Sequence, residues 1–569
     1  VGGGGEAGGQ RKERQASVRV RILNFYSEVK YDKTFRLDGD AVLPLDVDPA
    51  ALGTGVFVVR LDYALNSQTP QTLQTSQTWS DYARFSVLKP LDGKHATAQF
   101  YANHNWYERV SRCEHYMKKF VEWGWNSTDG RRNHTGPIKD AEDRLGIRNY
   151  VHPVVYEGRK LAEVADRMLT PEQAKEFKGD KHKWKAADPE KLAAIEQLAY
   201  ELAKECDPKD DIWTFWNEEE SWARQVGFDV HVKFVMAVQR GVRKAFAERG
   251  LPPPRFSETH GTSHYFAGRN YDAIEGYLKA ANDNGFKYDV VTIHPYQNID
   301  GGTLGPKDAD METQHLIDQM KEAGYPDSTP IMFTECFNMV PFRIPQWGAD
   351  GWGDSYRCNT QSSQDRGNRE FVMAASQARL YILALKYWPK VQLVHPWNCN
   401  PILDIRFSPL SFVLSVNTLG HLLPSPKYFG DAQPYGDVRG VCFLQDGKAV
   451  MPVWTTNHDV EWGVKTSPHV QLALPKDTRC YDLEGNERRI DFAADGTVRA
   501  AHAGTALLRC VRRRGAARFA QGGGRRGSLD RAVAGRPPRP RGQGAAGRPE
   551  RDEGGAARQA RHRRQGVRL

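Results

Sequence analysis

Short apolar runs alternate with amphipathic helical segments along the central part of the chain, residues 97–425. Most runs of strand length are followed by apolar residues at helical spacing, as in Leu192, Ile195, Leu198 and Leu202. Such alternation over about 320 residues is typical of a parallel α/β barrel or a doubly wound sheet. No G-x-G-x-x-G or Walker motif follows any of these runs, which disfavours the nucleotide-binding version.

This pattern predicts eight strand–helix units. The strands are expected at 98–102, 123–125, 146–155, 211–216, 255–257, 288–293, 330–334 and 391–394. The helices are expected at 113–122, 191–206, 230–249, 271–284, 311–323, 369–387 and 410–422. The fold class predicted for this region is therefore an α/β TIM (β/α)8 barrel, whose active site lies at the carboxyl ends of its strands.

Strand-like segments without a helical period flank the central region on both sides. Residues 17–96 predict an N-terminal β-rich module of sandwich type, and residues 426–510 predict a C-terminal β-sandwich. Residues 1–16 are Gly-rich and polar, and we expect them to form a flexible N-terminus. No secretory signal is recognisable in them, because they lack an apolar core.

The charge of the chain is unevenly distributed. Its net charge is +9, yet residues 511–569 contain 17 arginines, no lysine and 4 acidic residues, so the remainder carries a net −4. This Arg/Gly/Ala-rich tail is too poor in apolar residues to form a core and is expected to be disordered. It is either a non-native extension or a polyanion-binding arm. The abrupt loss of lysine and aromatic residues favours the extension, so we expect no nucleic-acid partner.

Composition excludes several other classes of protein and site. No apolar run approaches the roughly 18 residues of a membrane span, so we expect no membrane partner. The eight cysteines show neither C-x-x-C spacing nor a Cys/His cluster, which argues against structural zinc. We therefore expect neither a metal nor another cofactor.

Polar and aromatic residues follow the expected strands. Asn217 and Glu218 follow the fourth strand, and Glu335 follows the seventh. The ends of strands one, six and eight carry His104 and Asn105, His294 and Tyr296, and His395 and Trp397, respectively. Because the carboxyl ends of parallel barrel strands converge, these residues are expected to surround one crevice.

Two strand-end carboxylates suit the hydrolysis of a glycosidic bond. Retaining glycosidases place a nucleophile and an acid/base carboxyl about 5–5.5 Å apart on opposite sides of the scissile bond. We assign Glu218 as the acid/base and Glu335 as the nucleophile, with Tyr296 and His294 as hydrogen-bond donors to it. Asn217 can hydrogen-bond the 2-hydroxyl of the sugar. Trp397 offers an apolar platform to a pyranose face, and His104 and Asn105 complete the predicted substrate contacts.

At this point the chain resembles the retaining glycoside hydrolases of clan A, (β/α)8 enzymes with catalytic glutamates on strands four and seven. The resemblance covers residues 97–425 and implies that Glu218, preceded by an Asn, is the acid/base and Glu335 the nucleophile. It also likens His294-Pro295-Tyr296 to the strand-six residue that touches the nucleophile, and Trp397 to the strand-eight Trp beneath the sugar.

The flanking β modules resemble those of β-xylosidase-like members of the clan. One feature departs from the pattern, because the clan often has an Arg at the end of strand two. Here Trp125-Asn126 stands at that position, and the nearby Arg131, Arg132 and Arg148 are not clearly equivalent.

The expected function is retaining hydrolysis of O-glycosidic bonds in an oligo- or polysaccharide, by double displacement through a covalent glycosyl-enzyme. Such a carbohydrate substrate favours a secreted or periplasmic location. Two alternatives stay open. One is a non-catalytic carbohydrate-binding barrel. The other is a metal-dependent barrel hydrolase using His104, His152 and His294, which is disfavoured because none of these three belongs to a His-x-His or His-x-x-x-His pair.

Overall fold

The structure is a computed structural model of the chain, and it describes residues between 16 and 510. The gaps within this range are 27, 38–43, 66–77, 92–95, 98–99, 104–113, 126, 130–136, 151–157, 180–187, 206–211, 214–219, 258–260, 263–270, 295, 299–308, 340–373, 376, 397–411, 436–437, 456–469, 474–477, 490–496 and 501–505. The chain divides into two units, Val1–Gly523 and Gly524–Leu569, and every described residue lies in the first. The expected flexible N-terminus, except for Ala16, and the tail 511–569 lie outside the described residues.

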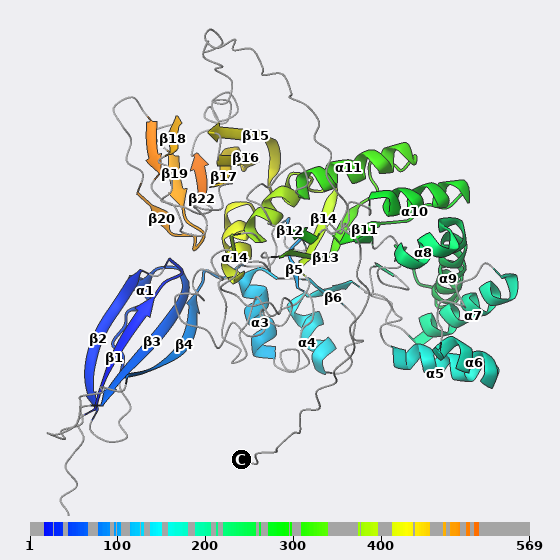
Figure 1. Ribbon diagram of the computed structural model, residues 1–569, viewed down its shortest axis with the longest axis horizontal. Helices are drawn as coiled ribbons and strands as arrows, with labels where there is room; N and C mark the ends of the chain where they lie inside the picture. The colour runs from blue at the N-terminus through cyan, green and yellow to red at the C-terminus, as the bar shows by residue number, and fades with distance from the viewer. Residues whose placement is uncertain are drawn as a thin grey trace, which may run out of the picture. The chain divides into compact units, whose positions relative to one another are not determined.

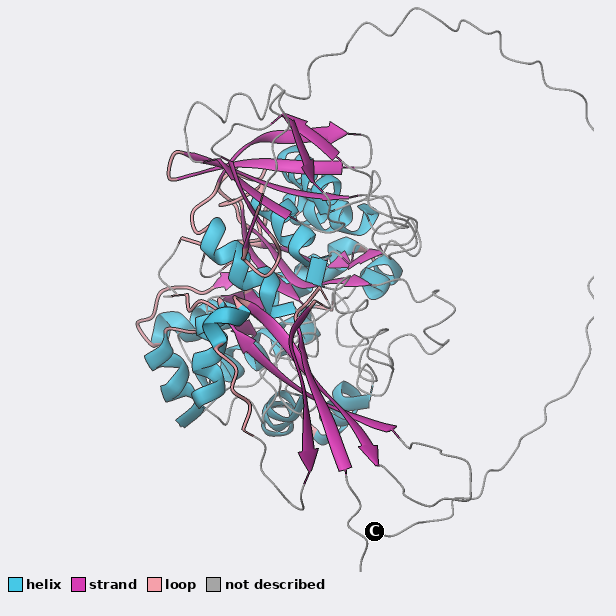
Figure 2. Cartoon of the chain, turned by 90° about the vertical axis from the view of Figure 1, so that its left-hand side faces the viewer, coloured by secondary structure: helices cyan, strands magenta, loops and turns pink. Residues whose placement is uncertain are grey.

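Helices and strands both make up large parts of the described chain, which confirms the mixed α/β class (Figure 2). The first described region is a four-stranded antiparallel sheet in the order β2–β1–β3–β4 (Figure 1). Its strands are β1 (Ala16–Leu23), β2 (Val29–Leu37), β3 (Gly55–Leu65) and β4 (Thr78–Val87). A four-residue helix, α1 (Pro49–Leu52), begins after Asp48, whose carboxylate accepts the Ala50 N–H at 2.9 Å.

Alternation along β1 fixes which face of this sheet is buried. Val18, Val20 and Ile22 are each at most 2% exposed, whereas Arg19 lies on the other face in an ion pair with Asp32. The described part of the N-terminal region contains this one sheet, so a second layer of the expected sandwich is not seen among these residues.

The central region contains short parallel strands. They are β5 (Ala102–Asn103), β6 (Ser127–Asp129), β7 (Arg148–Tyr150), β8 (Ile212–Trp213), β9 (Arg255–Phe256), β10 (Gly261–Thr262), β11 (Val291–His294), β12 (Tyr296–Asn298), β13 (Ile331–Met339) and β14 (Val391–Pro396). The pairs β5–β6, β6–β7, β8–β9, β10–β11, β11–β13, β12–β13 and β13–β14 are all parallel. Neighbours in the sheet therefore follow the order of the chain.

Two further contacts connect these pairs. The Asp289 N–H, just before β11, donates to the carbonyl of Phe256 in β9 at 3.0 Å. Tyr101 forms a parallel bridge with Val394, and the Val394 N–H donates to the Phe100 carbonyl at 2.8 Å. The last strand thus returns to the first, and the step from β7 to β8 is the one without a pairing among the described residues.

Helices separate these strands along the chain. They are α3 (Glu114–Trp123), α4 (Pro137–Leu145), α5 (Gly158–Met168), α6 (Pro171–Gly179), α7 (Pro189–Glu205), α8 (Glu220–Val226), α9 (Phe228–Glu248), α10 (Tyr271–Asp283), α11 (Ala309–Glu322) and α14 (Phe412–Leu422). Residues 374–375 and 377–385 are also helical. Helices α7 and α9 lie side by side (Figure 1). Gly241 permits this approach, because a Cβ there would lie 2.1 Å from the Glu196 carbonyl oxygen.

Two predicted strand positions are wrong in detail. Residues 123–125 form no strand, because Trp123 ends α3 and Gly124 turns the chain with a φ of 116°. The second strand begins later, at Ser127. The seventh strand does not stop at Thr334 but continues as β13 to Met339, so Glu335 lies within it.

The C-terminal region contains two antiparallel sheets. The larger has the order β15–β16–β17–β22–β19–β20 and the smaller pairs β18 with β21. Their strands are β15 (Lys427–Tyr435), β16 (Val438–Gln445), β17 (Lys448–Thr455), β18 (Val470–Ala473), β19 (Thr478–Tyr481), β20 (Glu487–Arg488), β21 (Thr497–Ala500) and β22 (Ala506–Cys510). The β16–β17 hairpin turns at Asp446-Gly447, both at positive φ, as a two-residue hairpin loop requires.

Candidate active site

Strand β13 carries Glu335 and lies between two strands that each contribute a buried histidine. On one side β11 ends at His294, and on the other side β14 includes His395. Both histidines are 0% exposed. A carboxylate-bearing strand is thus flanked by two imidazoles, groups that can donate or accept a hydrogen bond.

Residues of these strands lie at matching levels. Ile293 of β11 pairs with Phe333 of β13, and Phe333 pairs with Val394 of β14. His294 and His395 each follow by one residue, next to Thr334. The ring of His395 contacts this level directly, because its Nδ1 lies 2.6 Å from the Thr334 carbonyl oxygen.

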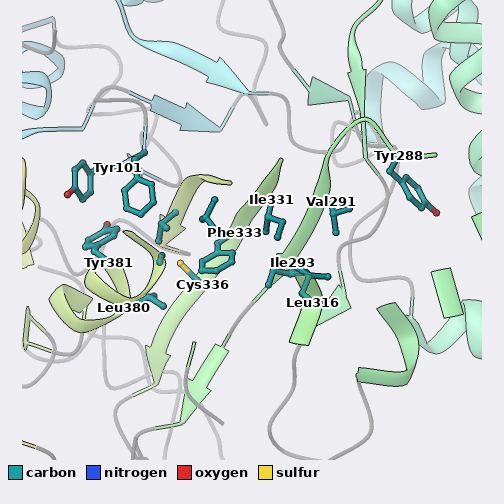
Figure 3. Close-up of a cluster of buried hydrophobic side chains, with 14 of the residues drawn as sticks. Tyr101, Tyr288, Val291, Ile293, Leu316, Ile331, Phe333, Cys336, Leu380 and Tyr381 are labelled. Carbon is teal, nitrogen blue, oxygen red and sulfur yellow. The ribbon is translucent and has the colours of Figure 1, made fainter. Parts of the chain in front are cut away.

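The strands show one face to an inner cluster and the other to the helices. One small apolar cluster contains a residue from each of β8, β13 and β14 and the residue just before β11. These are Ile212, Met332, Leu393 and Val290. Residues of the opposite parity, such as Val291 and Phe333, instead join the large core that includes the helices. Figure 3 shows part of that core, with Ile293 beside Leu316 of α11 and Phe333 beside Cys336. The small cluster therefore lies on the inner side of the parallel series.

Polarity rises along the inner face toward the carboxyl ends of the strands. Above the apolar cluster, Ser257 and Thr292 are both 0% exposed, and their hydroxyl oxygens lie 2.9 Å apart in a hydrogen bond. Thr334, 2% exposed, follows Met332 on the inner side of β13. His294 and His395 come next. Buried polar groups gathered at the carboxyl ends of parallel strands are typical of a catalytic or binding site.

Two buried tyrosines belong to the large core on the helix side of these strands. The rings of Tyr101 and Tyr381 lie 5.1 Å apart edge to face, and both side chains are 0% exposed. Burial raises the pKa of Tyr101 and of Tyr381 above the ordinary value of 10.0, so both stay neutral at physiological pH. Figure 3 shows Cys336 between Phe333 and Tyr381, and all three belong to the large core.

The structure places three of the predicted site residues on neighbouring strands. His294 lies in β11, Tyr296 in β12 and Glu335 in β13, and β13 pairs with both other strands. The side chains of Tyr296 and Glu335 are not described. The remaining predicted residues lie outside the described part: Asn217, Glu218, His104, Asn105 and Trp397.

Sequence reasoning did not assign a role to several buried polar residues at the same place. They are Ser257, Thr292, Thr334 and His395. His395-Pro396 repeats the His-Pro dipeptide of His294-Pro295 at a second strand end, and this repetition was the signal available in the sequence. The hydroxyl residues carried no such signal, since Ser and Thr are common in loops and strands alike.

The described residues include no group of three or more His, Cys, Asp or Glu side chains placed to hold a metal ion. His104 and His152 of the metal alternative lie outside the described residues. A search of the described helices finds none that is long and apolar enough to cross a membrane.

Comparison with known proteins places the fold. No protein-family profile and no curated protein sequence matches the chain. Among solved structures, the chain is similar to a family 39 glycoside hydrolase from the gut symbiont Bacteroides cellulosilyticus, with a TM-score of 0.58 and 13% identity over 87% of this chain and 94% of the other. The chain thus shares its fold with this structure, which confirms the resemblance at the level of the fold.

Two other matches have lower TM-scores. A glycoside hydrolase family 30 subfamily 8 xylanase from Clostridium acetobutylicum aligns with a TM-score of 0.38 and 10% identity, over 73% of this chain and 97% of that one. A β-glucuronidase from Parabacteroides merdae aligns with a TM-score of 0.31 and 12% identity, over 88% and 72% of the two chains. At these scores neither adds to the fold assignment.

Proposed function

We propose that the central region closes into a (β/α)8 barrel. The parallel pairings that follow the order of the chain support this closure, together with the contact of Tyr101 with Val394 that joins the last strand to the first. In the barrel β9 and β10 belong to strand five, and β11 and β12 to strand six. Glu335 is then on strand seven, and Glu218 follows strand four.

The barrel hydrolyses O-glycosidic bonds of an oligo- or polysaccharide with retention of configuration. The observation that carries this proposal is the position of Glu335 on β13 between two buried histidines, in a chain with a glycoside hydrolase fold. A carboxylate that accepts hydrogen bonds from neighbouring donors is held in its ionised form, as a nucleophile requires.

The reaction takes two displacements. The Glu335 carboxylate attacks the anomeric carbon while Glu218 protonates the departing glycosidic oxygen, which forms a glycosyl ester on Glu335. Glu218, now ionised, accepts a proton from water, and the water oxygen attacks the anomeric carbon and frees Glu335. Asn217 binds the sugar 2-hydroxyl, Trp397 supports the sugar face, and Tyr296, His294, His104 and Asn105 complete the substrate contacts.

Substitution of the two glutamates tests this proposal. Glu335→Gln is expected to abolish turnover of nitrophenyl glycosides and polysaccharides and to leave the circular dichroism spectrum unchanged. Glu218→Ala should retain activity on aryl glycosides with good leaving groups, because these need little protonation, and added azide should increase its rate. The control is Glu322→Gln, an exposed carboxylate of α11, which should behave as the wild type.

Three results would count against the assignment. Near-normal rates for both glutamate variants on every glycoside tested would exclude their catalytic roles. Saturable carbohydrate binding by the wild type with no turnover would instead favour a non-catalytic carbohydrate-binding barrel. Loss of activity on treatment with a chelator would favour the metal-dependent alternative.

A further inference from the structure

Strand β13 contains one extra residue at the level of Glu335, as its pairing with β14 shows. Phe333 pairs with Val394, and Cys336 pairs with Pro396. Between these two pairs β13 advances three residues and β14 advances two. Such an insertion is a β-bulge, which bends a strand and changes the direction of its side chains.

The strand on the other side of β13 gives the same result independently. Ile293 of β11 pairs with Phe333, and Tyr296 of β12 pairs with Phe337. From the first pair to the second, β13 advances four residues, whereas the neighbouring chain from β11 to β12 advances three. Both neighbours therefore locate the extra residue after Phe333 and before Phe337.

The bulge changes which residues of β13 face the helices. Ile331 and Phe333 belong to the outer core, and regular alternation would place residue 335 on that face as well. Cys336 occupies the outer core instead, 0% exposed and beside Phe333 and Tyr381 (Figure 3). The alternation has thus shifted by one residue at Thr334–Glu335.

A bulge removes backbone groups from the regular ladder, and these groups need other partners. For the Thr334 carbonyl oxygen this partner is a side chain, since His395 Nδ1 lies 2.6 Å from it. A carbonyl oxygen only accepts hydrogen bonds, so Nδ1 must carry the proton and donate it. His395 is 0% exposed and lies on β14, the strand whose register the bulge interrupts.

We propose that His395 is a positioning residue that holds the bulge at Thr334–Glu335, and that this bulge sets the backbone register at which β13 carries Glu335, the proposed nucleophile. The inference rests on the proposed function only where it calls Glu335 the nucleophile. The bulge and the hydrogen bond to Thr334 stand without it. A shift of about 1 Å in a reacting group can cost 10²-fold in rate, which sets the scale of the effect.

Two substitutions of His395 separate hydrogen bonding from packing. His395→Leu keeps an apolar side chain of similar size and removes the donor, whereas His395→Asn keeps an N–H donor near the position of Nδ1. We expect the kcat of His395→Leu to fall about 10²-fold with KM changed less than about threefold. The kcat of His395→Asn should be at least tenfold higher than that of His395→Leu. His315→Leu, at an exposed position of α11, is the control and should keep wild-type kinetics.

A measurement that needs no activity accompanies the kinetics. Nitrogen-15 histidine spectra of the full chain, with His395→Asn used for assignment, should show a protonated Nδ1 at His395. A crystal structure of His395→Leu should show the register of β13 relaxed between Phe333 and Cys336.

The outcomes distinguish the two proposals. If the wild type hydrolyses no glycoside, the proposed function fails. The protonation of His395 Nδ1 and the register of β13 in His395→Leu would still test the role of His395. An unprotonated Nδ1, an unchanged bulge in His395→Leu, or equal kcat values for the Leu and Asn variants would each overturn the positioning role.

Discussion

Glu484 is a buried carboxylate at the contact between the N-terminal sheet and the turn that joins β19 to β20. It is 1% exposed and accepts hydrogen bonds from the Phe25 N–H at 3.1 Å, the Asn24 amide at 3.2 Å and the Asn486 amide at 3.4 Å. A Cβ on Gly55 would lie 2.6 Å from its Oε1, so Gly55 leaves room for this approach. The contact links residues more than 400 positions apart in the chain.

The pKa of Glu484 is raised from 4.5 to about 7, mainly by burial and to a smaller extent by the nearby Asp482 carboxylate. The Phe25 N–H, Arg488 and Lys30 act in the opposite direction on this pKa without cancelling the effect of burial. Because the folded state holds the proton more tightly than the unfolded state, the free energy of unfolding falls as pH rises from about 4.5 to about 7. The pKa difference corresponds to about 3 kcal/mol of stability, which is present below pH 4.5 and is lost by the time the pH has risen past about 7.

Replacement of Glu484 by alanine removes this dependence on pH. The variant leaves the buried Phe25 N–H without its acceptor, at a cost of about 1–3 kcal/mol, whereas Asn24 and Asn486 keep other acceptors. It also removes the cost of burying an ionised carboxylate. We therefore expect Glu484→Ala to be less stable than the wild type by about 1–3 kcal/mol at pH 4.5. The difference should shift by about 3 kcal/mol in favour of the variant at pH 8.

Urea denaturation at the two pH values, with unfolding free energies extrapolated to water, measures this shift. Glu487→Ala is a matched control, because Glu487 lies three residues away and forms an ion pair with Arg479 in which both side chains are exposed. The control should lose less than about 1 kcal/mol at either pH. A wild-type minus Glu484→Ala difference that is the same at pH 4.5 and pH 8 would refute the reasoning, since folding would then leave the pKa of Glu484 unchanged.

Two further predictions concern packing and cysteine reactivity. Gly241→Ala should lower the free energy of unfolding by about 1–3 kcal/mol, because its Cβ would press on the Glu196 carbonyl, whereas Gly430→Ala has open space and should change little. Thermal or urea denaturation of the two variants checks this, and equal stabilities would contradict it. Burial raises the pKa of Cys442 to about 12, so iodoacetamide at pH 8 should leave it unmodified in the native chain and alkylate it in urea, as mass spectrometry would detect.

The helical part of the fold was predictable because amphipathic periodicity extends over many residues. Helices α7, α9, α10 and α11 lie within a few residues of their expected ranges. The central strands were harder, since a strand of two or three residues such as β6 carries too little pattern to place. Trp123 and Trp125 suggested a strand because both are large and apolar, yet they are buried around the end of α3. Helices α5 and α6 were not expected.

The strands that carry His294 and Glu335 were also predictable, since apolar runs precede both residues. The extra residue that β13 contains near Glu335 was not predictable. Alternation read from Ile331 and Phe333 assigns residue 335 to the helix face, where an unpaired carboxylate would be costly to bury. The extra residue in β13 changes this alternation, and it is visible only when the registers of both neighbouring strands are known. A carboxylate within a regular strand would have to compete with the core for the same face. A bulge changes the faces of the residues that follow it, and spacing along the sequence cannot reveal where a bulge lies.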